Sequence, residues 1–442
     1  MRLYNTLSRK TEEFAPINFP GVGLYTCGPT VYDYPQIGNW RTFVFEDILR
    51  RSLEFNGYKV THVMNATDVG HLTGDNVGNA DLGEDRMEKA AKREGKTAWD
   101  IAKFYIDDFV ESMTILNIES PTYFIRATDH IKEQIDLIAR LEKKGLTYQT
   151  GLGVYFNVAK FPDYGKLGGQ KLVDKRVATR DELKEDPDKI NPFDFALWKF
   201  SLPEERRQME WDSPWGRGYQ GWHIECSAMS MKYLGESFDI HTGGIDHVAI
   251  HHTNEIAQSE GATDKPLAKY WLHGEFLTVD GGRMGKSLGN AYTLHDILKK
   301  GFDPLALRYF YFTAHYRTKL NFTWEALEAA QNSLTKLRNR ANSASQGVAL
   351  RARFLEAIND DLNMPQALAI AWQTENRNDL VDFEKILGLD LFNEEKKEIP
   401  KEIRKLITDR EMARKEKDFK RADELRDMIK SKGYDVSDSK IS

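Results

Sequence analysis

The sequence predicts an α/β fold: a doubly wound parallel sheet that is interrupted by an inserted domain and followed by an α-helical bundle and a small C-terminal domain. Three observations predict it. The amino-terminal part alternates strand-like and helix-like patterns. The stretch from about 116 to 200 has a different pattern, with short strands and a polar segment, and helical patterns follow Tyr292. With 442 residues the chain is too long for one core, and about 150 residues per domain suggests about three domains.

The chain begins with a strand, a helix and a second strand. An apolar run ends at Cys27, a helical pattern covers about 39–56, and Gly57 is a suitable stop for that helix. A second apolar run at 60–64 then leads to Thr67. Parallel strands joined by a crossover helix bind ligands beyond their carboxyl ends, where both Cys27 and Thr67 fall. We therefore expect a site at this edge of the sheet.

The rest of the chain divides by texture. A helix near 130–144, short strands over 146–158 and a polar stretch at 174–188 indicate an insertion between two halves of the sheet domain. Charged residues around 394–397 indicate a linker. The expected segments are the first half of the sheet domain, 1–115; the inserted connective domain, 116–200; the second half, 201–265; a loop region, 266–310; the helical bundle, 311–395; and the C-terminal domain, 396–442.

Composition narrows the class of protein. An apolar content of 40% with 29% charged residues is ordinary for a globular protein. The amino terminus lacks the apolar run of a signal peptide, and no window reaches the roughly 20 apolar residues of a membrane span, so no membrane partner is expected. With only two cysteines, a reducing cytoplasm is favoured over a disulfide. Because the net charge is −6, a polyanion partner would have to meet a local basic patch.

Both cysteines lie in segments typical of a binding site. Cys27 opens CGPTVYDYPQIGN and Cys226 closes GWHIEC, while His251 and Glu255 stand four residues apart, on one face of a helix. Two thiolates, an imidazole and a carboxylate form a plausible tetrahedral zinc site. Either cysteine alone is explained as well by a small buried thiol. Four protein ligands usually close a structural site, unless Glu255 is a weak ligand or the zinc becomes five-coordinate with substrate.

Two segments fit phosphate binding. Gln36, Gly38 and Asn39 directly precede a helix, whose amino-terminal N–H groups and positive dipole end attract anions. A glycine-rich loop at 281–290 follows the strand-like run 275–279, although its spacing is not that of a Walker P-loop. An ordinary turn explains each segment alone. The polar side chains of the loop are Arg283, Lys286 and Ser287.

A third segment combines glycines with an acid after a strand. The paired glycines that end at Gly244 let a flat ring or a ribose approach the backbone, and Asp246 beyond them can bind ribose hydroxyls. His241 is either part of a site or a core histidine with satisfied partners. His247 and His252 are predicted to be simply packed or exposed.

Taken together, these motifs resemble those of class I aminoacyl-tRNA synthetases, and closely those of the cysteinyl-tRNA synthetases. The resemblance covers essentially the whole chain, and the motifs occur in the same order as in the family. The complete set of motifs is far more specific than any single motif. It is carried by CGPTVYDYPQIGN, GWHIECSAMS, GGIDHVAIHHTNEIAQSE, the KMSKS-like loop RMGKS and the tail KDFKRADELRDMI. The resemblance implies a Rossmann-like catalytic domain, a stem-contact region with the KMSKS-like loop, and a C-terminal domain in the anticodon region.

The resemblance also implies site residues. One zinc ion per chain would be bound by Cys27, Cys226, His251 and Glu255. The thiolate of the substrate cysteine would bind this soft metal, and the far less acidic serine hydroxyl would be rejected without an editing site. The family positions around the amino acid match Gly28, Thr67, Trp222 and His241. Those around ATP, which enters with Mg²⁺, match Gln36, Gly38, Asn39, Gly244, Asp246, Arg283, Lys286 and Ser287.

The implied reaction has two steps. The cysteine carboxylate attacks the ATP α-phosphate to give cysteinyl-adenylate and pyrophosphate, and the terminal ribose of tRNA(Cys) then takes the cysteine and releases AMP. Positioning of the reactants and stabilisation of the phosphate charge supply most of the rate acceleration. The residues expected to provide both are Gln36, Asn39 and Lys286. The expected enzyme is a cytoplasmic monomer whose partners are L-cysteine, ATP and tRNA(Cys). The charged stretch 401–432 is expected to contact tRNA, unless it is only a solvated helix face.

The sequence departs from the family pattern in three places. Gln36 replaces the usual first histidine of the HIGH-type motif, and the KMSKS-like loop has Arg283 and Gly285 where lysine and serine are usual. The stretch after Tyr434 lacks the basic, tryptophan-bearing tail common in the family. Two other functions remain open: a ligase that joins cysteine to an amino sugar, and a non-catalytic relative that senses cysteine or RNA.

Overall fold

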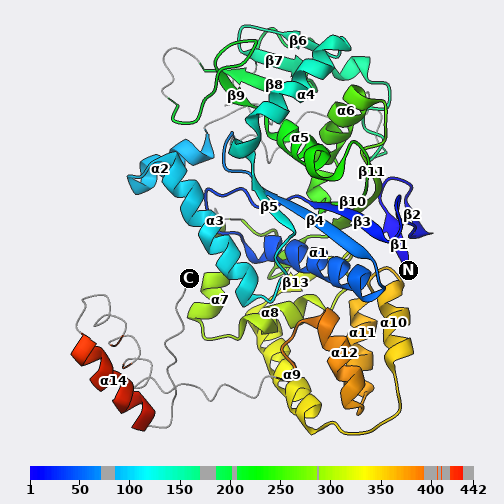
Figure 1. Cartoon of the computed structure of the whole chain (residues 1–442), viewed down its shortest axis with the longest axis vertical. Helices are drawn as coiled ribbons and strands as arrows, with labels where there is room; N and C mark the ends of the chain where they lie inside the picture. Colours follow the sequence, from blue (N-terminus) through cyan, green and yellow to red (C-terminus); the bar gives the residue numbers. More distant parts are fainter. Residues whose placement is uncertain are drawn as a thin grey trace. The chain divides into compact units, whose positions relative to one another are not determined.

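The computed structural model describes residues 1–70, 85–169, 186–201, 207–285, 288–392, 406, 410 and 419–431. It contains two compact units, Met1–Leu391 and Phe392–Ser442, and each is described by itself. The fold class predicted from the sequence is confirmed, since a parallel sheet flanked by helices forms the centre of the first unit and helices follow it in the chain (Figure 1).

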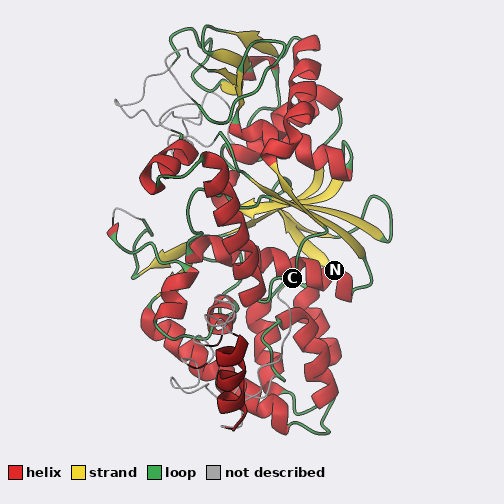
Figure 2. Ribbon diagram, turned by 60° about the vertical axis from the view of Figure 1, so that its left-hand side comes forward, coloured by secondary structure: helices red, strands yellow, loops and turns green. Residues whose placement is uncertain are grey.

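The central sheet has five parallel strands in the order β11-β10-β3-β4-β5, and Figure 2 shows them among the helices. Its strands are β3 (Gly21–Thr26), β4 (Lys59–Ala66), β5 (Tyr123–Arg126), β10 (Phe238–Gly244) and β11 (Ala268–Gly274). The strand order reverses between β3 and β10, so the sheet is doubly wound, and ligands bind at such a point.

Helices cover both faces of this sheet. In Figure 1, α1 lies on one side of the strands, and α4, α5 and α6 lie on the other. The helices of this part are α1 (Ile37–Phe55), α2 (Arg86–Glu94), α3 (Ala98–Ile115), α4 (Ile131–Lys143), α5 (Trp222–Leu234) and α6 (His251–Thr263). Buried aromatic rings join α1 to α3, since Trp40 stacks on Phe109 with ring centroids 5.0 Å apart.

A second, antiparallel sheet has the order β6-β7-β8-β9. Its strands are β6 (Thr147–Gln149), β7 (Gly153–Phe156), β8 (Phe195–Phe200) and β9 (Gly218–Gln220). The strand pairing differs from the expected segment limits at 115, 200 and 265. The central sheet includes β5 and β11, and the antiparallel sheet includes β9. Hydrogen bonds between strands decide which sheet a strand joins, and the local sequence pattern does not show them.

Short strands and helices complete the first unit. The strands β1 (Arg2–Asn5) and β2 (Lys10–Glu13) pair antiparallel, and β12 (Leu277–Val279) and β13 (Leu320–Phe322) pair parallel. The helices are α7 (Leu294–Lys299), α8 (Pro304–Tyr311), α9 (Trp324–Ser343), α10 (Arg351–Asn359), α11 (Met364–Gln373) and α12 (Arg377–Leu387), with 3-10 turns η2 (Ala127–His130), η3 (Val158–Lys160) and η5 (Ile245–His247).

In the second unit, α14 (Phe419–Ser431) buries Ala422 and Leu425 against Leu406. Arg410, which the sequence places in a cationic stretch, is also buried. Across the described ranges of both units, no helix combines the length and the apolar character needed to cross a membrane.

Candidate active site

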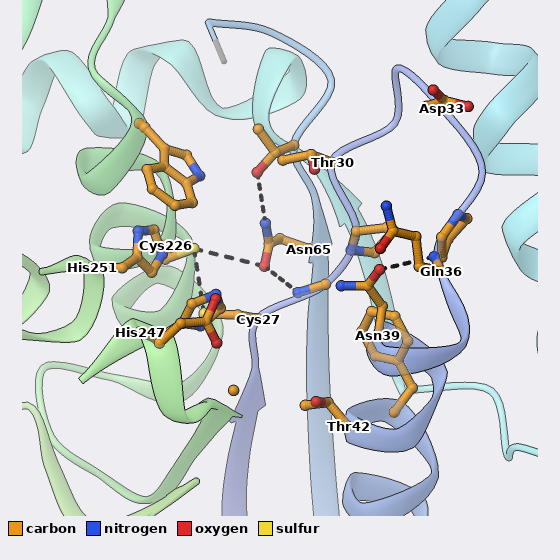
Figure 3. Close-up of a pocket in the computed structure, with 18 of the residues that line it drawn as sticks. Cys27, Thr30, Asp33, Gln36, Asn39, Thr42, Asn65, Cys226, His247 and His251 are labelled. Atoms are coloured by element: carbon orange, nitrogen blue, oxygen red, sulfur yellow. Dashed lines mark hydrogen bonds between the residues drawn. The ribbon is translucent and has the colours of Figure 1, made fainter. Parts of the chain in front are cut away.

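A cavity of about 550 Å³ opens at the carboxyl ends of β3, β4 and β10 (Figure 3). The strand ends, α1, α5, η5 and the start of α6 all contribute to its wall. Most of the residues predicted for the site line it: Cys27, Gly28, Gln36, Asn39, Thr67, Trp222, Cys226, Gly244, Asp246 and His251. The structure therefore brings side chains from distant parts of the sequence to the sheet edge that the strand ends predict.

The two cysteines meet a histidine and a glutamate at the base of this cavity. The Sγ atoms of Cys27 and Cys226 lie 4.0 Å apart, and His251 Nε2 lies 3.0 Å from Glu255 Oε1. One ligand atom from each of the four residues lies within 4.8 Å of the others. All four residues are buried, and Cys226 and His251 line the cavity. The arrangement is a four-ligand cluster with its cysteine and histidine side open to a ligand.

The charges of this cluster are strongly coupled. The hydrogen bond with Cys27 lowers the pKa of the Cys226 thiol to about 6, whereas burial raises the pKa of Cys27 well above its usual value. Burial alone would lower the pKa of His251, but Glu255 and Cys226 raise it to about 10. Burial likewise opposes ionisation of Glu255, but His241 and His251 hold its pKa well below the usual range. Cys226 and Glu255 therefore carry negative charge beside a protonated His251, and a metal ion bound there would take the place of the histidine proton.

Two more histidines lie behind the cluster. His252 Nε2 is 3.3 Å from Cys27 Sγ, and its Nδ1 is 2.8 Å from His273 Nε2. His241 Nε2 lies 2.9 Å from Glu255 Oε2, and its Nδ1 has no hydrogen-bond partner among the described residues. His241, predicted to contact the substrate, is instead fully buried behind Glu255 and does not line the cavity, because β10 carries it into the sheet core.

A second group of four, Cys27, His241, His252 and Glu255, is also close enough to hold an ion. As a metal ligand through Nε2, His241 would keep a buried Nδ1–H without an acceptor, whereas metal-bound histidines normally donate that N–H. His251 Nδ1, by contrast, lies 2.9 Å from His223 Nδ1. The group with Cys226 and His251 therefore fits zinc better, and the group of two sulfurs, one nitrogen and one oxygen suits that metal.

Gly28 and Asn65 form the wall next to Cys27. A Cβ atom on Gly28 would lie 1.7 Å from the carbonyl oxygen of Asn65, so only glycine fits there. The Gly28 N–H donates to Asn65 Oδ1 at 3.0 Å, and Asn65 Nδ2 donates to Thr67 Oγ1 at 3.2 Å (Figure 3). Asn65 Oδ1 also lies 3.7 Å from Cys226 Sγ. Sequence reasoning missed Asn65, whose only signal in the sequence is its place directly after the apolar run at 60–64; the structure places it inside β4.

The other end of the cavity is formed by the start of α1 and by η5. Asn39 Oδ1 accepts the N–H of Gln36 at 2.9 Å, which fixes the first turn of the helix (Figure 3). Gly38 does not line the cavity, but a Cβ there would lie 2.9 Å from Met284 Cε. The absence of a side chain therefore lets the glycine-rich loop lie against α1. A helix start next to an open cavity suits an anionic group.

The glycine-rich loop is described over 281–285 and 288–290. Asn290 supports it, because its Oδ1 accepts the N–H of Gly285 at 2.9 Å and its Nδ2 donates to Arg283 O at 3.1 Å. Arg283 does not line the cavity in this conformation. Lys286 and Ser287 lie outside the described residues.

The comparisons with known proteins agree with these motifs. The family described as "tRNA synthetases class I (C) catalytic domain" matches residues 13–332, and the "Cysteinyl-tRNA ligase anticodon binding domain" matches residues 396–441. The chain belongs to the cysteine–tRNA ligase family. The resemblance identified from the sequence is thereby confirmed, and the chain is a ligase of the class I aminoacyl-tRNA synthetase type.

Relatives extend over nearly the full chain. The chain is 48% identical to "Cysteine--tRNA ligase 1" of Burkholderia lata, over 99% of the chain and 95% of the relative. It is 45% identical to the "Cysteine--tRNA ligase" of Treponema denticola, over 99% and 98%. Among solved structures, the methionyl-tRNA synthetase of Mycobacterium tuberculosis with methionyl-adenylate matches with a TM-score of 0.57 at 15% identity, over 84% of this chain and 88% of that one. This last match supports the fold alone.

Proposed function

We propose that the chain joins L-cysteine to tRNA(Cys) with ATP, through a cysteinyl-adenylate. The observation that carries the proposal is the shared cavity. Three members of the four-ligand cluster (Cys27, Cys226 and His251) and the start of α1 line one space of about 550 Å³, so an amino acid held at the cluster would lie next to a nucleotide at the helix start. Such positioning of two reactants is the main need of an adenylyl-transfer reaction, in which the carboxylate attacks the α-phosphate of ATP and pyrophosphate leaves.

In this proposal Cys27, Cys226, His251 and Glu255 hold zinc. When bound, zinc supplies a soft cation that prefers a thiolate to a hydroxyl. His252 contacts Cys27 and His241 contacts Glu255, so these two histidines orient the ligands rather than the substrate. Trp222, whose ring lies 4.3 Å from that of His251, closes the wall beside the cysteine position.

The start of α1 would bind the phosphates of ATP with Mg²⁺. The positive dipole end of this helix would stabilise the charge that develops when the cysteine carboxylate attacks the α-phosphate. Gln36 and Asn39 order this turn, and Gly244 and Asp246 line the cavity on the side proposed for the adenosine. The glycine-rich loop would add contacts to ATP through Arg283, Lys286 and Ser287. In the second step, the 2′-hydroxyl of the tRNA terminal ribose takes the cysteine.

The roles expected for the domain segments carry over as part of the proposal, with β5 and β11 counted in the central sheet and β9 in the antiparallel one. The sheet segments would hold both substrates, the region around the loop and the helical bundle would contact the tRNA stem, and residues 396–442 would contact the anticodon region. The match of residues 396–441 to an anticodon binding domain supports this over an amino-sugar ligase, which needs no such domain.

Pyrophosphate exchange tests the proposed reaction. We expect exchange that depends on L-cysteine, does not occur with L-serine, and is lost after removal of metal by a chelator. Charging of tRNA(Cys) by the same preparation then separates this function from transfer to an amino sugar. A protein that binds cysteine but catalyses no exchange would be the sensor instead.

A further inference from the structure

Arg41 is a buried cation on α1 that the mechanism above does not use. It is 4% exposed, and its two terminal nitrogens donate only to main-chain oxygens. Nη1 donates to the carbonyls of Glu275 and Phe276 at 2.8 and 2.7 Å. Nη2 donates to the carbonyls of His315 and Thr318 at 3.1 and 2.5 Å. Among the described residues, no carboxylate pairs with this guanidinium.

The same helix shows the more usual arrangement further along. Arg51 and Arg308 both contact the buried carboxylate of Asp47, at 2.8 and 2.5 Å. Burial lowers the pKa of Arg41 to about 10, so the side chain stays charged at neutral pH. Its hydrogen bonds go to carbonyl groups, and the nearby Tyr311 and Glu275 act on its pKa without pairing with it. A planar guanidinium can reach four carbonyls in fixed directions, which a lysine ammonium cannot.

The four carbonyls lie at the base of the glycine-rich loop. Glu275 and Phe276 connect β11 to β12, and β12 leads directly into the loop. His315 and Thr318 precede β13, the parallel partner of β12. Phe276 itself lines the cavity. Arg41 therefore joins the helix that begins at the nucleotide side of the cavity to the two-stranded sheet from which the loop emerges.

The far end of the loop is tied to the same helix turn. The N–H of Ile37 donates to the carbonyl of Tyr292 at 2.9 Å, and Gln36 forms an isolated bridge with Thr293. The carbonyl of Ile37 accepts the hydroxyl of Tyr311 at 2.6 Å. The first turns of α1 thus hold both ends of the loop, one through main-chain pairing and the other through Arg41.

We propose that Arg41 is a positioning residue for the nucleotide, because it fixes the base of the loop that carries Arg283 and Lys286 to the helix start where the phosphates would bind. The proposal rests on the proposed function, since ATP is the ligand whose binding Arg41 would support. Its charge at this end of α1 adds to the positive end of the helix dipole.

Two matched substitutions on α1 test the proposal. Arg41→Lys keeps the charge but cannot span four carbonyls, and we expect it to raise KM for ATP in cysteine-dependent pyrophosphate exchange about tenfold, with KM for cysteine unchanged. Arg51→Lys is the control, because Arg51 is also buried and also donates to carbonyls, those of Asn117 and Lys385, on another side of the helix. It should leave KM for ATP unchanged. Equal effects of both variants on KM for ATP would overturn the proposal.

Hydrogen–deuterium exchange adds a measurement that needs no catalysis. In the unaltered protein, saturating ATP with Mg²⁺ should slow amide exchange in 275–280 and in 315–320 together, because one guanidinium joins them. Slower exchange in 275–280 alone would refute the role of Arg41, even if Arg41→Lys fails to fold. If the unaltered protein protects both segments but catalyses no pyrophosphate exchange, the proposed function fails while the positioning role stands.

Discussion

The two sides of the cavity are built from different kinds of atoms. On the side proposed for cysteine (the cysteine side), side chains from the end of β3, from α5 and from α6 contact one another, so that sulfur, nitrogen and oxygen atoms gather within 4.8 Å. On the side proposed for ATP (the nucleotide side), the structure supplies a helix start and glycines at positions where a side chain would collide, as at Gly38 against Met284 and Gly244 against Asp246. Side-chain atoms would bind the ligand on the cysteine side, and main-chain atoms would make many of the contacts on the nucleotide side.

This difference predicts unequal tolerance to substitution. A metal ligand cannot change its donor atom without changing the affinity for the ion. A helix start, in contrast, attracts anions through its N–H groups whichever residue precedes it. The departures from the family pattern at Gln36, Arg283 and Gly285 all fall on the nucleotide side or in its loop, where this tolerance is expected.

The largest effect is expected from Cys226→Ser. Replacing the sulfur should release the metal and lower the preference for cysteine over serine at least about 100-fold, more than the loss of a residue that only orients a ligand. Metal content after dialysis and the kcat/KM ratio for the two amino acids in pyrophosphate exchange measure this. Ser230→Ala on the same helix is the control, since the Ser230 hydroxyl donates to the carbonyl of Ser227, within the helix itself. Unchanged zinc content in Cys226→Ser would refute the ligand assignment.

Glu46 links the two sides and should make stability depend on pH. Burial of this α1 carboxyl raises its pKa from 4.5 to about 8. Its Oε1 accepts from Thr242 of β10 at 2.8 Å, and its Oε2 has no partner in the part of the chain that the structure describes. The native state then keeps a proton that the unfolded chain loses near pH 4.5. The contribution of Glu46 to stability is therefore full below pH 4.5 and is lost as the pH rises towards 8.

Urea unfolding of the unaltered protein and of Glu46→Gln between pH 5 and 8 measures this contribution. The variant, which cannot titrate, should gain relative stability with rising pH, by at most about 5 kcal/mol. Glu54→Gln, on a more exposed part of the same helix, serves as the control and should show no such trend. A constant difference between Glu46→Gln and the unaltered protein would show that Glu46 is not held neutral.

Removing residues 396–442 should separate the two reactions. Because the proposed amino acid and nucleotide sites lie wholly in the first unit, pyrophosphate exchange should be nearly unchanged. Charging of tRNA should fall about 100-fold in kcat/KM, since phosphate and anticodon contacts would be lost. Equal losses in both assays would contradict this division of labour.

The cysteine side could be predicted from residue types, and the residues behind it could not. Two cysteines, together with a histidine and a glutamate four residues apart, indicate a metal-binding site whatever the fold around them. The roles of Asn65 and His252 depend on how β4 and α6 pack against Cys27, which no local pattern contains. Likewise, the apolar run at 60–64 predicts most of β4. The place of β5 in the same sheet, in contrast, depends on hydrogen bonds to a strand about 60 residues earlier, which the sequence pattern does not show.

The smallest effect is expected from Gln36→His, the change that restores the usual family residue. Gln36 lines the cavity at the start of α1, where its amide is a neutral donor, whereas an imidazolium adds charge to the same position. Losing one donor to a developing oxyanion costs about 3–4 kcal/mol, so exchanging one donor for a better one should raise the adenylation rate only about three- to tenfold. Single-turnover adenylate formation measures this, with KM for cysteine expected to stay constant. A loss of activity would show that Gln36 contacts something other than phosphate, and that the nucleotide side is less tolerant than its backbone construction implies.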